Sequence, residues 1–439
     1  MELKNKFLKE LYYKFKENEI LSKGSSAFIF KIIGSFLGYA FLLIVTRTAG
    51  AEAWGVFALC LALLNITSIF SRMGVDVAIL KFTASFKNEI TKAKAIYLQG
   101  LKITIPLSIL FTLLLFLFSD FIAVNIFNKG NLSSYIQKIA LGVLPFTIIY
   151  LNAQSFRGLK KISHFAFFQH VSKFLFAIVF LIASSYLMGF SIQESVFFAF
   201  VAALYCVMII SFFLLKKELK SEKEKSPISI QTLLKTAFPM MLSTSILLIM
   251  SWADTIIIGM YKSETEIGVY NGAIKLAMIS GIVLGALNSI VAPKISEAFN
   301  NNKKEEFVLI VRQSTKIIFY STLPILVLLI AFPEFLLSFL GEEFLIGKTA
   351  LYVLLVGQIV NAFSGSVGVI MQMTGNEKLF QNILTLALLS NIVLNFLLIP
   401  KHGIVGAAIA SSMSLVFWNL TSVFFIYKKH KVLTLYNFK

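Results

Sequence analysis

The sequence predicts an all-α, polytopic membrane protein with about 12 transmembrane helices in two parallel six-helix halves around a central cavity. Three observations predict this fold: the hydropathy, the positions of the basic residues and an internal repeat. Of the 439 residues, 57% are hydrophobic and 14% are charged, and the mean hydropathy is +0.82. Water-soluble domains carry about 25% charged residues, so too little polar surface is left here to cover a soluble core. The composition therefore argues against soluble enzymes, fibrous proteins and disordered tails.

The hydropathy predicts the individual spans, because a helix needs about 20 apolar residues to cross a bilayer. In the first half the predicted spans are 27–47, 55–75, 96–118, 134–156, 165–188 and 193–215. In the second half they are 233–261, 267–292, 307–331, 347–373, 380–399 and 404–427. Ahead of them, residues 1–25 carry an apolar residue at every fourth position among lysines, which predicts a helix lying on the cytoplasmic membrane surface.

The basic residues predict the orientation of these spans. With the amino terminus inside, the cytoplasmic segments hold 27 of the 40 lysines and arginines, and the outward connections hold about four. An excess of lysine and arginine marks cytoplasmic loops. We therefore expect a multi-pass protein with both termini in the cytoplasm. Most of the net charge of +18 is explained in this way, and no basic face remains for binding nucleic acid.

A polar segment and an internal repeat divide the chain. The segment 216–230 is rich in lysine and glutamate and predicts a cytoplasmic linker between an N-terminal half, 26–215, and a C-terminal half, 231–428. A cytoplasmic tail, 429–439, is expected to follow.

The repeat relates the two halves in the same orientation. A shift of 213 residues places Gly55-Val56-Phe57 on Gly268-Val269-Tyr270 and Lys81 on Lys294. Parallel repeats of this kind form transporters whose halves rock around a central cavity.

Ionisable residues inside spans are costly in hydrocarbon and usually face a polar interior. Asp254 and Lys275 both lie about 12 Å from the outer ends of adjacent antiparallel spans, so an ion pair between them is predicted. Such a pair would be purely structural, or would break and form again with a substrate or coupling ion. Asp76, just after the second span, is expected to pair with Lys81 at the inner surface.

The other intramembrane charges are mostly basic. Arg312 and Lys316 are four residues apart and share one helix face, which would suit a diphosphate. Removing both charges is therefore expected to abolish transport. Arg47 is expected at the cavity mouth, and for Lys31 both a place in the cavity and snorkelling to the surface stay open. Only Asp254 is a clearly buried acid, so an anionic substrate is favoured over an organic cation.

Several prolines lie within predicted spans, and one glycine-containing segment looks like a phosphate loop. Pro106 and Pro324 fall in the corresponding third spans of the two halves and are hinge candidates. The glycines around Gly347-Lys348-Thr349 have the wrong spacing for a phosphate loop, so no nucleotide is expected. No nucleophile–base arrangement or metal-ligand cluster is evident in the sequence, which predicts neither catalytic residues nor a metal site, and hence no enzyme.

Three motifs carry a family resemblance. Gly50-Ala51-Glu52-Ala53-Trp54-Gly55-Val56-Phe57 resembles the G-x-E-x-x-G-x-[FY] turn of bacterial polysaccharide flippases. Residues 254–259 and 266–270 resemble the second-half version of that turn. Residues 395–408 are similar to the N-x-x-L-I-P-x-x-G-I-x-G-A-A signature. The chain thus resembles, over nearly its whole length, the O-antigen flippase (Wzx-type) branch of the multidrug/oligosaccharidyl-lipid/polysaccharide exporter superfamily.

The resemblance implies a function. A flippase of this type moves an undecaprenyl-diphosphate-linked oligosaccharide, such as an O-antigen or capsule unit, across the bacterial cytoplasmic (inner) membrane by alternating access. It implies a cationic cavity, no cofactor apart from a possible coupling H+ or Na+, and possible polysaccharide polymerase or glycosyltransferase partners. Two alternatives stay open: a multidrug or organic cation antiporter of the same superfamily, and a membrane scaffold that transports nothing.

Overall fold

The computed structural model describes residues 19–86, 89–187, 192–220 and 226–435. Within these ranges the regular structure is helical and contains no strand, so the predicted all-α class is confirmed. Most of the surface helix expected within 1–25 lies outside the described residues.

The N-terminal half contains α2 Glu19–Arg72, α3 Val75–Ser85, α4 Ile90–Leu117, α5 Ser119–Phe121, η1 Ile122–Ile126, α6 Leu132–Ala140, α7 Val143–Gly158, α8 Ile162–Ala166, η2 Phe167–Val171, α9 Ser172–Leu187 and α10 Ile192–Glu218. The C-terminal half contains α11 Ile230–Tyr261, α12 Glu264–Met278, α13 Gly281–Asn300, α14 Lys304–Ala331, α15 Pro333–Ser338, η3 Glu342–Gly347, α16 Lys348–Ser364, α17 Val367–Met373 and α18 Glu377–His430. The predicted linker 216–230 therefore coincides with the junction between α10 and α11.

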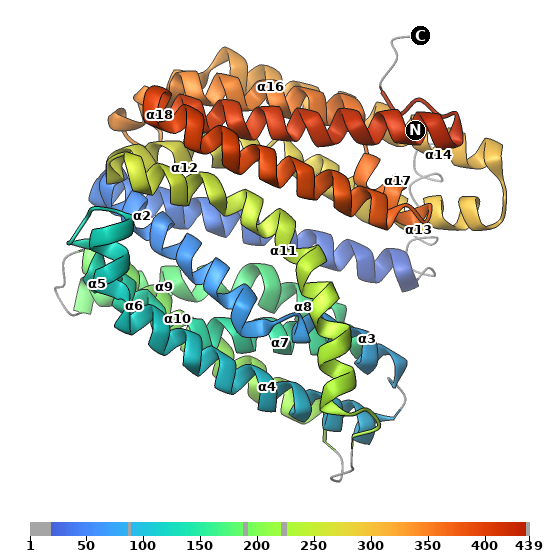
Figure 1. Ribbon diagram of the computed structural model, residues 1–439, viewed down its shortest axis with the longest axis horizontal. Helices are drawn as coiled ribbons and strands as arrows, with labels where there is room; N and C mark the ends of the chain where they lie inside the picture. Colours follow the sequence, from blue (N-terminus) through green and yellow to red (C-terminus); the bar gives the residue numbers. More distant parts are fainter. Residues whose placement is uncertain (1–18, 87–88, 188–191, 221–225, 436–439) are drawn as a thin grey trace, which may run out of the picture.

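The longest helices, α2 and α18, each contain two predicted spans. Both have 54 residues, which would make a straight helix about 80 Å long, far more than a bilayer needs. Each is broken by a glycine with positive φ, Gly50 in α2 (80°) and Gly403 in α18 (56°), and doubles back there (Figure 1). Without a Cβ, glycine adopts this conformation with little strain. We refer to the parts before and after each glycine as the first and second limbs.

The number of spans depends on how these breaks are treated. Eight helices in the described ranges are long and apolar enough to cross a membrane, or ten if each of two bent helix pairs counts as one span. If the two limbs of α2 and the two limbs of α18 are counted as separate spans, the number of spans rises from ten to the predicted twelve. Two other predicted spans are interrupted: 134–156 is formed by α6 and α7, and 347–373 by α16 and α17.

The helices form two lobes that approach each other where α2 and α18 turn and diverge toward the opposite end (Figure 1). We call the turning side the far end, and the side where α2 begins and α18 finishes the terminus end. Helix α11 connects the lobes, because its first part packs on α3. A Cβ on Gly74, just before α3, would lie only 2.2 Å from the carbonyl oxygen of Ala237 in α11.

The two halves meet at the far end through the repeat itself. A Cβ on Gly55 would lie 1.8 Å from the carbonyl oxygen of Glu264, and a Cβ on Gly268 would lie 1.9 Å from that of Ala51. The same shift of 213 that relates Gly55 to Gly268 also relates Ala51 to Glu264. The contact between α2 and α12 is therefore symmetric, with each glycine admitting the backbone of the other half.

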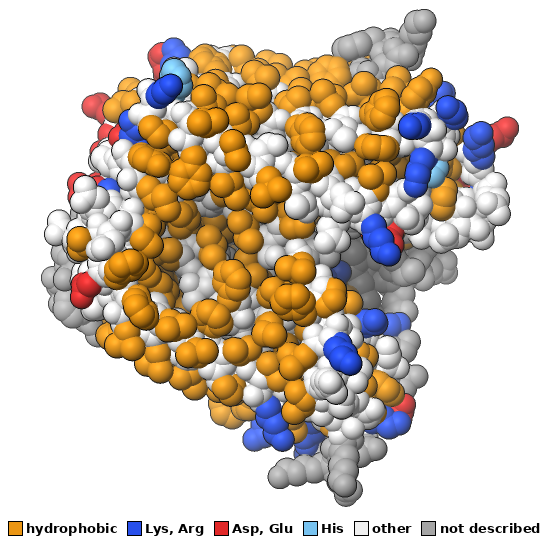
Figure 2. Space-filling view, in the orientation of Figure 1, with side chains coloured by type: hydrophobic (Ala, Val, Ile, Leu, Met, Phe, Trp, Pro, Cys, Tyr) orange, Lys and Arg blue, Asp and Glu red, His pale blue; other side chains and the backbone are white. Residues whose placement is uncertain are grey.

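The surface agrees with a protein that crosses a membrane along its long axis. Exposed large hydrophobic side chains occur on the described helices of both lobes, for example Phe36, Leu117, Phe213 and Phe335. Figure 2 shows them as a broad band, with lysines and arginines gathered toward the terminus end. The chain is a multi-pass membrane protein.

Candidate functional site

A cavity of about 610 Å³ lies between the lobes. The first limb of α2, η2 and α9 line it from one lobe, and α12, α13, α16 and α18 line it from the other. Three lysines reach it: Lys31, Lys173 and Lys275. None of the described residues that line it is acidic. Three positive charges without a lining carboxylate make this cavity suited to an anion.

Lys275 is held at the boundary between the lobes. Its Nζ lies 5.6 Å from the ring centroid of Trp54, which belongs to the opposite lobe. The backbone carbonyl of Lys275 accepts a hydrogen bond of 2.5 Å from the hydroxyl of Tyr39, also in α2. The aromatic face stabilises the ammonium without neutralising it, so its charge stays available to a ligand.

Lys173 has a similar environment inside the N-terminal lobe. Its side chain is 8% exposed, and its Nζ lies 4.8 Å from the ring centroid of Phe146 and 4.7 Å from that of Tyr150. Its position inside the predicted fifth span did not indicate a role, because the sequence does not show which way a helix turns its side chains. The structure places it in the cavity with Lys31 and Lys275.

Buried amide oxygens add acceptors to the same cavity. The side-chain oxygens of Gln169, Asn288 and Asn361 are shielded from solvent and have no hydrogen-bond partner in the described part of the chain. Buried polar atoms are normally satisfied, so each is a candidate contact for a ligand that donates hydrogen bonds, such as a sugar hydroxyl.

The cavity is closed toward the far end by contacts between the lobes. Arg47 donates hydrogen bonds to the backbone carbonyls of Phe339 (2.7 Å) and Ser338 (3.0 Å). Lys129 donates one of 2.5 Å to the carbonyl of Lys262 and lies 3.9 Å from Glu264. Burial lowers the pKa of Lys129, although Glu264 and Glu266 oppose the shift. Arg47, predicted at the cavity mouth, thus connects the lobes and does not line the described cavity.

Arg312 and Lys316 also lie outside this cavity. Both are exposed on α14, as are Leu309, Tyr320 and Leu323 on the same helix. Their shared helix face is as predicted, but it is not among the faces that line the cavity. A substrate contact by this pair stays a prediction.

The predicted pair of Asp76 with Lys81 is wrong. Asp76 instead forms an ion pair of 3.1 Å with Arg72, and both side chains are only 8% exposed. The guanidinium of Arg72 also lies 4.2 Å from the ring centroid of Tyr150. Arg72 therefore sits in the lobe interior and not in a cytoplasmic loop. The turn at Gly74, with φ of 75°, brings the first residues of α3 back beside the end of α2.

Removing one charge of this buried pair is expected to destabilise the protein. Asp76→Asn leaves the Arg72 guanidinium without its counter-charge and should lower the free energy of unfolding by about 3 kcal/mol. The thermal unfolding of the purified protein in detergent measures this as a lower Tm. Lys81→Ala, a charge change at an exposed neighbouring position, serves as the control. An equal Tm for Asp76→Asn and the wild type would contradict the assignment.

The predicted pair of Asp254 with Lys275 is also absent from the described residues. Asp254 is 2% exposed, and its carboxylate accepts hydrogen bonds from Tyr270 (2.5 Å), Asn395 (2.7 Å) and Asn391 (3.3 Å), and from Ser411. These neutral partners come from α12 and both limbs of α18. The side-chain oxygen of Asn395 has no hydrogen-bond partner within the described ranges. A buried carboxylate surrounded by neutral donors can take up a proton or a small cation.

The internal repeat shows that this polar cluster belongs to the second half only. The shift of 213 relates Asp254 to Phe41 and Tyr270 to Phe57. In the first lobe those two rings pack with centroids 5.4 Å apart. An aromatic contact thus occupies the position where the second lobe has a hydrogen-bonded carboxylate.

Pro106 and Pro324 lie in the helices expected, α4 and α14, which continue through them. Sharp changes of direction among the described helices occur elsewhere, for example at Gly50, at Gly403 and at the 49° bend between α12 and α13. A hinge role for the two prolines stays a prediction.

Comparison with known proteins agrees with these features. The sequence profile of the family described as polysaccharide biosynthesis protein matches residues 20–299, more than half of the chain. The chain belongs to this family. The profile of the MatE family matches residues 239–397 in addition. Membership confirms the predicted family resemblance and points to transport and not to catalysis.

Family relatives match over most of their length. The chain is 23% identical to a probable low-salt glycan biosynthesis flippase, Agl15, of Haloferax volcanii, over 88% of this chain and 79% of that protein. It is 21% identical to a putative O-antigen transporter of Shigella flexneri, over 85% of this chain and 89% of the relative.

Solved structures share the fold of this family member. An inward-facing multidrug resistance MATE family transporter aligns with a TM-score of 0.75 at 14% identity, covering 92% of this chain and 98% of the other. The lipid II flippase MurJ, in an inward closed conformation, aligns with a TM-score of 0.70 at 18% identity, covering 92% and 87%. An outward-facing MATE family transporter gives 0.64 at 13% identity, covering 94% and 95%.

Proposed function

We propose that this chain is a flippase that moves a lipid-diphosphate-linked oligosaccharide across the membrane by alternating access. The observation that carries the proposal is the cavity between the lobes, with Lys31, Lys173 and Lys275 and no carboxylate among its described lining residues. A diphosphate distributes its negative charge over several oxygens, so it can be bound by several ammonium groups at once.

The remaining lining residues suit the rest of such a substrate. The amide oxygens of Gln169, Asn288 and Asn361 offer acceptors for sugar hydroxyls. The lipid would stay in or beside the bilayer. The relatives named as a glycan biosynthesis flippase and an O-antigen transporter support this substrate class. Undecaprenyl diphosphate as the carrier, and a polymerase or glycosyltransferase as partner, belong to the same proposal.

The direction of access follows from the lobe contacts. The far end is closed, and the lobes diverge toward the terminus end. The described state would therefore give access to the cavity from the terminus end. The predicted excess of basic residues in cytoplasmic segments would place that end in the cytoplasm. The protein would then receive its substrate from the inner leaflet of the bacterial cytoplasmic (inner) membrane and release it at the outer leaflet after the far end opens.

An ion gradient would drive the cycle through Asp254. The cluster around this carboxylate joins α11, α12 and both limbs of α18, so binding a proton or Na+ there would change how these helices pack. A change in the second lobe would reach the cavity through α12, which carries both Tyr270 and Lys275.

A multidrug antiporter is the alternative, supported by the MatE match over residues 239–397. An organic cation needs acidic groups in the cavity, whereas the described lining is basic. The charge of the cavity therefore favours the anionic substrate.

Transport by proteoliposomes tests the proposal. The probe is a fluorescent polyprenyl-diphosphate disaccharide, and its appearance in the opposite leaflet is followed by quenching. Replacing Lys31, Lys173 and Lys275 together by alanine is expected to slow transport by about 100-fold or more, because each charge-assisted contact contributes about 1.5–3 kcal/mol.

Arg312→Ala combined with Lys316→Ala is the comparison variant, because both side chains are exposed on another helix face. We expect the larger loss in the cavity variant. If the α14 variant lost transport while the cavity variant retained it in full, the substrate site would be assigned to α14 instead of the cavity. Transport of a cationic dye but not of the lipid-linked probe would favour the antiporter.

A further inference from the structure

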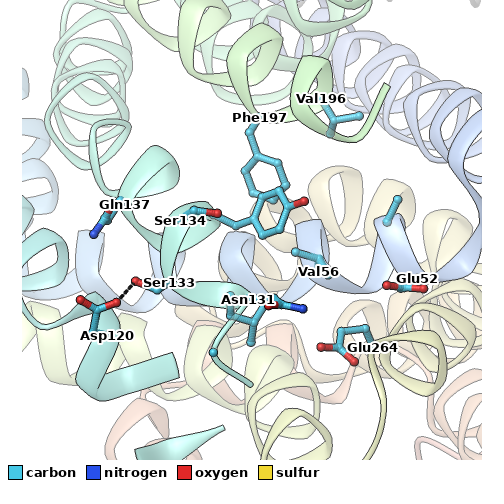
Figure 3. A pocket seen from close by; sticks show the side chains of 14 residues that line it. Glu52, Val56, Asp120, Asn131, Ser133, Ser134, Gln137, Val196, Phe197 and Glu264 are labelled. Carbon is cyan, nitrogen blue, oxygen red and sulfur yellow. Dashed lines mark hydrogen bonds between the residues drawn. The ribbon is translucent and has the colours of Figure 1, made fainter. Parts of the chain in front are cut away.

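A second cavity, of about 620 Å³, opens at the far end of the N-terminal lobe. Figure 3 shows the side chains of Glu52, Asn131, Ser134 and Glu264 around it, with Phe197 forming one wall. These residues come from the turn of α2, the start of α6, the start of α10 and the start of α12. This outer pocket shares no lining residue with the central cavity.

The outer pocket combines hydrogen-bonding groups with an aromatic wall. The side chains of Glu52, Asn131 and Ser134 make no hydrogen bond to any other described residue. Asp120 accepts a hydrogen bond from Ser133, which fixes one more carboxylate at the pocket. The rings of Tyr135 and Phe197 pack against each other at 4.9 Å with an angle of 35° between their planes.

An apolar groove of about 460 Å³ adjoins the pocket, and Phe197 lines both. The rest of the groove is formed by Leu141, Phe198, Val201, Ala202 and Tyr205, with Lys138 as its only charged lining residue in the described part of the chain. Phe198 is 51% exposed and Leu141 46%, so the groove faces outward from the bundle.

Along both α6 and α10, residues that line the pocket come before residues that line the groove. On α6, Ser133 and Ser134 line the pocket, whereas Lys138, one turn later, lines the groove. On α10, Val196 lines the pocket, whereas Tyr205 lies about 14 Å further along in the groove. Both helices therefore lead from a polar pocket at the far end into an apolar groove within the membrane-spanning part, and α6 carries Lys138 at the transition.

We propose that the outer pocket and groove bind a lipid-linked saccharide in the outer leaflet after its translocation. The saccharide occupies the pocket, the diphosphate lies near Lys138, and the first part of the lipid chain lies in the groove. The proposal rests on the proposed function, since it assigns a second position to the same substrate class.

The chemistry of each part matches its ligand group. Sugar hydroxyls are both donors and acceptors, so they suit carboxylate, amide and hydroxyl side chains, while the apolar face of a sugar packs on an aromatic ring. The carboxylates of Glu52, Asp120 and Glu264 repel a diphosphate, which keeps that group out of the pocket and at the lysine. Carboxylates without a basic cluster also make the site unsuited to a free phosphate.

Photocrosslinking to the full chain in nanodiscs tests this site. One probe is a polyprenyl-diphosphate disaccharide with a diazirine in the first isoprene unit, and the other is the same lipid diphosphate without sugar. Labelling of the segment 196–205 is measured by mass spectrometry. The disaccharide probe is expected to label it about tenfold more than the sugar-free probe, the effect of one or two hydrogen bonds and a stacked ring.

The variant Asn131→Ala with Ser134→Ala should remove this difference without disturbing the fold, because both side chains are exposed. Asn125→Ala, an exposed amide of η1 outside the pocket, is the matched control and should retain it. Equal labelling of the wild type by the two probes would overturn the proposal, because the groove would then accept any lipid.

A further variant separates this inference from the proposed function. The triple alanine variant of Lys31, Lys173 and Lys275 should lose transport and keep the sugar-dependent labelling of 196–205. Loss of that labelling in the triple variant would overturn an independent outer site. Absence of transport by the wild type would overturn the proposed function alone, because the labelling does not depend on transport.

Discussion

Gly55→Ala is expected to slow transport by about tenfold or more, because the lobes can no longer close at the far end. The new Cβ would lie 1.8 Å from the carbonyl oxygen of Glu264, a backbone atom that no side-chain rotation can move. The two helices would have to separate, at a cost of about 1–3 kcal/mol, and about 1.4 kcal/mol changes a conformational equilibrium tenfold. Gly268→Ala should act in the same way against Ala51.

The distance between the lobes measures this effect directly. Spin labels at the exposed positions Asn125 and Glu342 report on the two lobes at the far end, and their separation should increase in Gly55→Ala. Gly130→Ala is the matched control, since a Cβ there meets nothing within 4 Å. Normal transport and an unchanged label distance in Gly55→Ala would show that closure at α2 and α12 is not part of the cycle.

Asp254→Asn is expected to uncouple transport from an ion gradient. The substitution preserves the size of the side chain and most of its hydrogen bonds. It removes the only charge among the described residues of the cluster with Tyr270, Asn395 and Ser411. One elementary charge moved through 100 mV is worth about 2.3 kcal/mol, which corresponds to about 50-fold. A stimulation of up to this size by an imposed gradient should disappear in the variant.

Proteoliposomes with a proton gradient or a Na+ gradient, imposed separately, identify the ion. Glu334→Gln is the control, because this carboxylate is exposed and bound to Lys348 at 2.6 Å near the far end. It should keep the response of the wild type. Equal stimulation of Asp254→Asn and the wild type by the same gradient would contradict a coupling role for the carboxylate.

The distribution of hydrophobic residues was sufficient to predict the helices. All twelve predicted spans overlap helices, or limbs of α2 and α18, that begin or end within a few residues of the expected positions. The reason is that hydrocarbon imposes a length on every span and requires its backbone hydrogen bonds to be satisfied without water, which an apolar helix does within itself. The shift of 213 likewise predicted which glycines are equivalent, and these glycines are in contact.

The environments of the charged residues were not predictable in the same way. Hydropathy gives the depth of a residue along its helix but not the direction in which its side chain points, which depends on how neighbouring helices pack. Arg312 and Lys316 therefore had the correct spacing but lie on an exposed face. Lys173, with no distinguishing spacing, lies in the cavity.

The two predicted charge pairs were wrong for the same reason. Asp254 and Lys275 are at matching depth, yet Asp254 points toward α18 and Lys275 toward Trp54 of the other lobe. Asp76 pairs with Arg72 because the positive φ of Gly74 turns α3 back beside α2, a local geometry that the sequence did not indicate.

The sequence by itself determined the all-α class, the approximate spans, the two repeated halves and the predominance of basic residues in the membrane interior. These follow from composition and periodicity, which act on each segment separately. The tertiary structure decided which charges share a cavity, which carboxylate lies among neutral donors, and where polar and apolar surfaces adjoin at the far end. Those features depend on the rotation of each helix about its axis, which is determined by packing between segments that are far apart in the chain.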